Sequence, residues 1–206
     1  MRQAAIDLEL VAAALEAKGY AVSRFATAAT AADYLDSQVD GRSVGFGDSE
    51  TLLALGLYDR LSRHNQVWDP MHPAAGESFN SVARRCLGTD IFFTSVNALA
   101  ASGEMVNIDG TGNRVAGSLF GHERVYFVLG INKIAPSLDL AIERARQVAA
   151  PLNAARHHFR TPCAVKRDHC FDCKSPDRIC CAQVIYYQKM RFMDMEVVLI
   201  EEDLGL

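Results

Sequence analysis

The chain has 206 residues, half of them hydrophobic, and a formal net charge of −4 at pH 7. This length supports one sizeable core, so we expect one main domain, and the acidic balance offers no basic field to a phosphate backbone, which excludes nucleic acid as an expected partner. No apolar stretch approaches the roughly 18 residues that span a bilayer, and the N-terminal sequence has no secretory signal, which together predict a cytoplasmic protein without a membrane span.

The first third of the chain predicts helices and strands in alternation. An amphipathic helix ends at Gly19, and its expected apolar side carries Ile6, Leu10, Ala13 and Ala14. There follow a strand at 20–25, a helix that begins after Thr27, a strand through Val44 and Phe46, and a helix capped by Asp48 or Ser49.

The alternation continues to the C-terminus. Strands are expected at 66–70, 90–100, 104–110 and 123–130, and helices at 78–88, with Cys86 in the core, and at 113–121. A long helix at 137–159 has Leu140 and Val148 on its apolar stripe and is interrupted at Pro151. Two last strands, 183–190 and 195–206, are expected to pair as a hairpin or to join a sheet edge.

This order predicts an α/β fold with a mainly parallel central sheet flanked by helices. We divide the chain into a ligand-binding α/β domain at 1–160, a cysteine-rich loop at 161–182, and C-terminal strands at 183–206 that return to the main domain.

The loop contains four cysteines, Cys163, Cys170, Cys173 and Cys180, with the spacing C-x6-C-x2-C-x6-C. Four thiolates satisfy a zinc ion or an iron–sulfur cluster, and this spacing does not distinguish the two. A redox pair, core packing or disulfides are the alternatives, and a reducing cytoplasm disfavours the last. Cationic side chains at positions 160, 166, 167, 174 and 178 would offset thiolate charge. Cys181 is a spare thiol, and His169 is a weaker candidate ligand.

Three polar segments are candidates for a ligand site. The first combines Gly47, Asp48, Ser49 and Thr51 at a helix N-terminus, where free N–H groups and hydroxyls suit a phosphate or carboxylate. The second contains Asp109, Gly110, Gly112, Asn113 and Arg114, and the third contains Asn132 and Lys133. All three are expected at the carboxyl ends of parallel strands, where ligands bind in α/β folds. Ordinary glycine turns and helix caps are the alternative interpretation of each.

Glu50 follows the first segment and is a candidate nucleophile or general base, although a glutamate in the first turn of a helix is also favoured by the helix dipole. The histidines and Ser49 lack the spacing or the G-x-S-x-G motif that would indicate a hydrolytic triad.

Several motifs in order resemble the LUD-domain (lactate utilisation) family: GFGDSETLLALGLYD, DIFFTSVNAL, VNIDGTGNRVAG, VYFVLGINKI and TPC…CFDCKSPDRIC. The resemblance implies a fold similar to the ribose-phosphate isomerase and CoA-transferase superfold. It also implies a link to the oxidation of lactate to pyruvate, with iron–sulfur or oxidoreductase subunits as partners. The family's first loop usually reads G-G-S, whereas this chain has Gly47-Asp48-Ser49.

The sequence therefore favours a protein that binds a small carboxylate or phosphorylated ligand and a four-cysteine metal centre. In this hypothesis Gly47, Ser49 and Thr51 donate hydrogen bonds, Arg114 and Lys133 balance the ligand charge, and Asn97 and Asn113 orient the ligand. Two alternatives remain open: an isomerase-like or CoA-transferase-like enzyme that uses Glu50, and a non-catalytic scaffold or regulatory subunit with a structural zinc.

Overall fold

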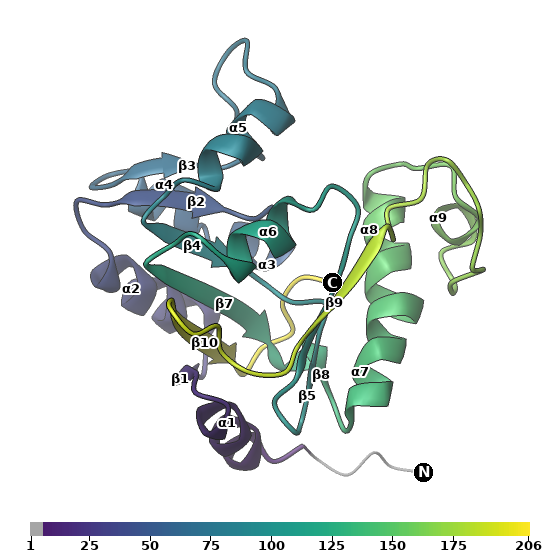
Figure 1. Cartoon of the computed structure of the whole chain (residues 1–206), viewed down its shortest axis with the longest axis horizontal. Helices are drawn as coiled ribbons and strands as arrows, with labels where there is room; N and C mark the ends of the chain where they lie inside the picture. The colour runs from purple at the N-terminus through teal and green to yellow at the C-terminus, as the bar shows by residue number, and fades with distance from the viewer. Residues whose placement is uncertain (1–5) are drawn as a thin grey trace.

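The computed structural model describes residues 6–206. All neighbouring strands of its main sheet run parallel to each other (Figure 1). Its six strands lie in the order β1 (Ala21–Phe25), β10 (Asp194–Ile200), β7 (Arg124–Gly130), β4 (Ile91–Thr94), β2 (Ser43–Phe46) and β3 (Gln66–Trp68). The predicted α/β class with a mainly parallel central sheet is confirmed.

A smaller second sheet lies beside the first. It has the order β8 (Ile134–Ala135), β5 (Ala98–Ala100), β6 (Met105–Asp109) and β9 (Ala182–Tyr186). β6 pairs antiparallel with both β5 and β9. The prediction that all three polar segments follow strands of one parallel sheet is therefore wrong for the second segment, because β6 belongs to this second sheet.

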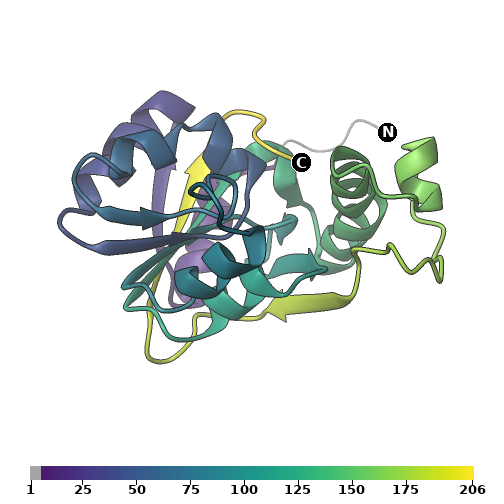
Figure 2. The same ribbon diagram turned by 90° about the horizontal axis from the view of Figure 1, so that it is seen from above.

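Helices cover both faces of the main sheet, which lies between them in Figure 2. One layer contains α1 (Leu8–Ala17), α5 (Phe79–Cys86) and α6 (Asn113–Leu119), and the other contains α2 (Ala28–Gln38), α3 (Glu50–Ala54) and α4 (Leu57–Leu61). Alternate residues of β7 point to opposite faces of the sheet. Phe127 packs against the first helix layer, and Tyr126 and Val128 pack against the second. A strand buried on both faces is continuously apolar, as β7 is.

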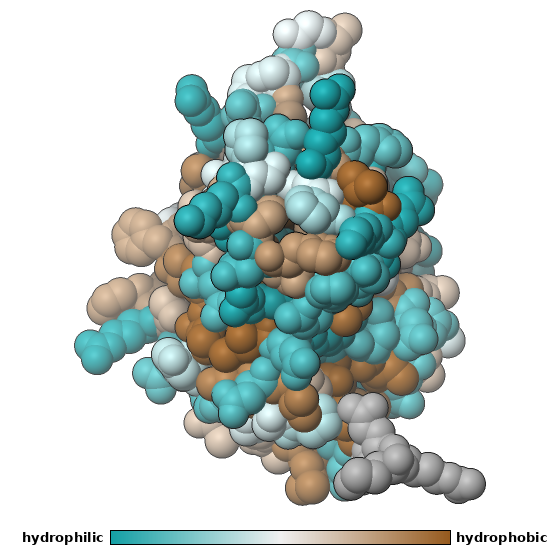
Figure 3. All heavy atoms as spheres, turned by 90° about the vertical axis from the view of Figure 1, so that its right-hand side faces the viewer, coloured by the Kyte–Doolittle hydropathy of each residue, from teal (hydrophilic) through white to brown (hydrophobic). Residues whose placement is uncertain are grey.

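The long C-terminal helical region covers the second sheet and consists of α7 (Leu138–Arg144), a π-helical segment η2 (Ala145–Ala149) and α8 (Ala150–Arg156). The interruption expected at Pro151 occurs as the π segment just before it. The expected stripe is wrong, because Leu140 and Val148 are exposed, whereas the buried positions of α7 and η2 are Ala141, Ala145 and Ala149. Small side chains allow this helix to approach the sheet closely. Figure 3 shows hydrophilic and hydrophobic side chains interspersed on this side of the molecule.

Other expectations have mixed outcomes. Thr27 and Ser49 cap α2 and α3, and Cys86 is buried. The apolar side of α1 was assigned wrongly, because the buried residues are Val11, Ala12 and Leu15 and Leu10 is exposed.

The last two strands do not form a hairpin. β9 lies at an edge of the second sheet, and β10 lies inside the main sheet between β1 and β7.

Cys163 lies on a short helix, α9 (Pro162–Lys166), whereas the following cysteines lie in irregular backbone. Across residues 6–206, none of the helices combines the length and apolar character needed to cross a lipid bilayer.

Candidate functional site

A buried lysine marks the point where three adjacent parallel strands end. The 3-10 turn η1 (Ile131–Lys133) follows β7 and places Lys133, which is 4% exposed, beneath the surface. Its Nζ donates to Thr51 Oγ1 at 2.9 Å and to Ser95 Oγ at 3.0 Å. Thr51 follows β2 and Ser95 follows β4, so the three groups meet at the carboxyl ends of β2, β4 and β7, the usual ligand side of an α/β sheet.

Lys133 lines a cavity of about 40 Å³. The cavity brings together residues from all three predicted segments, together with Asn97: its lining includes Asp48, Ser49, Glu50, Asn97, Arg114 and Lys133. The predicted convergence of the segments is therefore present, although α6 supplies Arg114 from beside the second sheet.

A larger groove of about 430 Å³ adjoins this cavity, because the two share Asp48, Arg114 and Asn153. The rest of the second predicted segment lines the groove, including Asp109, Gly110 and Asn113. The groove and the small cavity are therefore neighbouring spaces with a common wall.

The charged groups around the cavity hold one another in place. Arg114 donates from Nη2 to the Ile108 carbonyl at 2.6 Å, and its Nε lies 3.4 Å from Asp109 Oδ2. Arg156 pairs with Glu50 and lies 3.3 Å from Asp48. Since the Glu50 carboxylate is already engaged by a guanidinium, it has less freedom to act as a nucleophile.

Four predicted ligand-binding residues also have structural roles. A Cβ on Gly47 would lie 2.9 Å from the Phe92 ring, so the absence of a side chain serves packing. Gly112 has a φ of +88° at the start of α6, which favours glycine. The Asn132 Oδ1 accepts a hydrogen bond from the Leu204 N–H at 3.1 Å, and Thr51 is completely buried behind Lys133.

The surroundings of Lys133 destabilise its charged form. Burial lowers its pKa from 10.5 to about 7, and the positive charges of Arg144 and Arg114 act in the same direction. Glu50 opposes them with a smaller effect. A substantial fraction of the amine is therefore neutral near pH 7.

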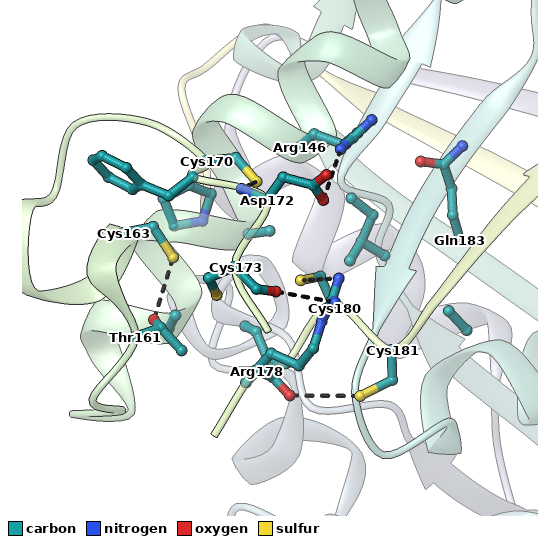
Figure 4. Close-up of a pocket in the computed structure, with 17 residues that line it drawn as sticks. Arg146, Thr161, Cys163, Cys170, Asp172, Cys173, Arg178, Cys180, Cys181 and Gln183 are labelled. Atoms are coloured by element: carbon teal, nitrogen blue, oxygen red, sulfur yellow. Dashed lines mark hydrogen bonds and ion pairs between the residues drawn. The ribbon is translucent and has the colours of Figure 1, made fainter. Parts of the chain in front are cut away.

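The four predicted cysteine ligands line a second cavity, of about 260 Å³, between α8, α9 and the loop that leads into β9 (Figure 4). Cys181 also lines it. The Cys170 Sγ accepts from the Asp172 N–H at 3.4 Å, and the Cys180 Sγ accepts from Arg178 Nη2 at 3.2 Å. Donors of this kind stabilise thiolates and metal-bound sulfur.

The chemistry of this donor set fits a thiolate-bound group, since four thiols face one cavity and a guanidinium offsets their charge. Within residues 6–206, however, no three His, Cys, Asp or Glu side chains are close enough to hold a single ion. His169, the weaker candidate, does not line the cavity.

Three residues near Lys133 were missed by the sequence analysis: Ser95, Arg144 and Arg156. Ser95 had a usable signal, because it follows a buried strand directly, as Lys133 does after its own strand. Arg144 donates to the carbonyls of Asn132 and Asn97 from the long helix, and no local motif marks it.

Comparison with known proteins supports the fold and the family. The sequence model of the LUD domain matches residues 8–200. A crystal structure of a DUF162 family protein from Deinococcus radiodurans is similar, with a TM-score of 0.55 and 13% identity over 94% of this chain and 95% of that one. eIF2B delta from Chaetomium thermophilum has a TM-score of only 0.35, with 14% identity over 67% of this chain and 58% of that one. A search of curated proteins found no match.

Proposed function

The chain belongs to the LUD domain family, and from this we propose that it binds a small carboxylate or phosphorylated ligand beside Lys133 and holds a metal centre with Cys163, Cys170, Cys173 and Cys180. Members of this family are expected to take part in lactate utilisation, so we propose a role as a subunit in the oxidation of lactate to pyruvate, with iron–sulfur or oxidoreductase subunits as partners.

One observation carries the proposal: the ligand groove and the cysteine cavity share a wall. Ile108, Arg178 and Ile179 line both. The groove in turn shares Asp48, Arg114 and Asn153 with the lining of the Lys133 cavity. A ligand in the groove would therefore lie next to the cysteine site.

The anion preference follows from the cations at the site. Arg114 lines both the groove and the small cavity. Lys133 and Ser95 line the small cavity and add hydrogen-bond donors there. Carboxylates and phosphates are the groups that guanidinium and ammonium donors bind best.

For the cysteines we propose an iron–sulfur cluster rather than zinc. A single zinc ion binds each thiolate at about 2.3 Å and so needs the four sulfurs close together. Here the four thiols line one cavity of about 260 Å³, which has room for a centre of several atoms. When bound, such a cluster supplies one-electron transfer.

Metal analysis tests the cysteine site. The protein is purified without oxygen and assayed for iron, acid-labile sulfide and zinc, with the quadruple Cys→Ser variant as control. Iron and sulfide in equal amounts, absent from the variant, would support the cluster. Zinc alone would identify a structural zinc site, and the absence of all three would refute the metal proposal.

Ligand binding is tested by thermal shift with lactate, pyruvate, sugar phosphates and inorganic phosphate. A ligand at about 100 times its dissociation constant stabilises a protein by roughly 2.7 kcal/mol. The shift should be lost in Arg114→Gln and retained in Arg63→Gln, which changes an exposed arginine outside the site. No shift with any of these ligands would favour the scaffold alternative.

A further inference from the structure

Lys133 has surroundings that differ from those of a lysine held in a salt bridge. Both of its hydrogen-bond partners, Thr51 Oγ1 and Ser95 Oγ, are neutral hydroxyls, and both residues are buried. A buried ammonium without a directly bonded carboxylate is costly, and loss of the proton relieves that cost. The hydroxyls can equally hydrogen-bond to the lone pair of a neutral amine.

The neutral amine has access to a ligand. Lys133 forms part of the wall of the 40 Å³ cavity, which exceeds the ~10–15 Å³ that one water molecule requires. Arg114 and Asn97 line the same cavity, and Arg114 also lines the groove. A lysine with a nucleophilic amine and an arginine that can bind a carboxylate therefore line one small space.

We propose that Lys133 forms an imine with the carbonyl carbon of a small 2-oxo acid. This inference rests on the proposed function, because the 2-oxo acid enters the same anion site. The carbonyl is what a neutral amine attacks, Arg114 and Asn97 provide donors for the adjacent carboxylate, and the size of the cavity restricts the ligand to a short chain.

The reaction balances without an oxidant or a reductant. The Lys133 nitrogen lone pair forms a bond to the carbonyl carbon, and the carbonyl oxygen takes up a proton to give a carbinolamine. Loss of the nitrogen proton and expulsion of the hydroxyl group, which leaves as water after protonation, form the C=N bond. Thr51 and Ser95 lie within 3.0 Å of Nζ and can pass protons between the nitrogen and the departing oxygen.

Reductive trapping tests the proposal. The full-length protein is incubated with pyruvate and sodium cyanoborohydride, and the intact mass and the peptide map are measured. We expect one reduced adduct per chain, located at Lys133 and absent when lactate, which has no carbonyl, replaces pyruvate. Lys133→Met should lose the adduct, whereas Lys189→Met, which changes a lysine outside both sites, should retain it.

Pyruvate binding is measured in parallel by thermal shift, so that a failure of the imine proposal can be distinguished from a failure of the proposed anion site. Binding without an adduct at Lys133 would overturn the imine and leave the anion site standing. An adduct spread evenly over the surface lysines would also overturn it. If no anion binds and no adduct forms, both proposals fall. The peptide map of the wild-type protein decides the location even if Lys133→Met does not fold.

Discussion

Replacing Lys133 by Met should change how the stability of the protein depends on pH. The native pKa of about 7 lies below the ordinary 10.5. Between these values the unfolded chain holds a proton that the native protein has released, so raising the pH stabilises the native state. Below about pH 7 both states are protonated, and the cost of burying the charge, about 5 kcal/mol from a shift of this size, is fully present.

The measurement is urea denaturation of the wild-type protein and the variant at several pH values. The difference between their free energies of unfolding cancels the titration of groups that do not interact with the amine, and the charged groups that do act on it are Arg114, Arg144 and Glu50. From about pH 7 to pH 9 the wild-type protein should gain about 2 kcal/mol relative to Lys133→Met. The hydroxyls of Thr51 and Ser95, 3.4 Å apart, remain able to bond to each other in the variant.

A difference that stays constant over this pH range would show that the native pKa of Lys133 is not lowered, and the argument for a neutral amine would fail. Arg63→Gln, at an exposed position outside both sites, provides the control and should follow the wild-type protein at every pH.

Four further substitutions distinguish effects on the metal site from effects on the core. Cys170→Ser should abolish metal binding, whereas Cys181→Ser should retain it, as measured by iron and sulfide per chain. In Gly110→Ala the new methyl would lie 2.7 Å from the Ile179 carbonyl oxygen, so metal content should fall more than the melting temperature. Gly47→Ala places a methyl 2.9 Å from a core aromatic ring and should cost about 1–3 kcal/mol in urea denaturation without changing the metal content.

Local signals predicted most of the elements, because caps and apolar strands act over a few residues. Thr27 and Ser49 begin their helices through hydrogen bonds from side chain to backbone, which short-range sequence patterns reveal. The position of β10 was not predictable in this way. It pairs with β1 across most of the chain length, and nothing local distinguishes a central strand from an edge strand.

The buried face of the long helix was predicted wrongly for a different reason. Leu140 and Val148 are its large apolar residues and were expected to face the core, yet the sheet packs against Ala141 and Ala145. A hydropathy pattern predicts burial of the large apolar side chains, whereas close approach of a helix to a sheet requires small side chains at the contact. The size of the available space depends on tertiary structure, so the sequence pattern alone selected the wrong face.

The segment from the end of β6 to the start of α6 joins the two sites. The Asp109 carbonyl accepts from the Cys181 N–H at 3.0 Å, and Gly110 lies against the backbone of Ile179. A few residues later, Arg114 lines the Lys133 cavity. The cysteines and this glycine segment are separate features of the sequence, since 48 residues lie between Arg114 and Cys163. Since one short segment contacts both, the positions of the cysteine loop and of Arg114 are set together, and the proposed ligand site and the cysteine cavity lie in one continuous region of the molecule.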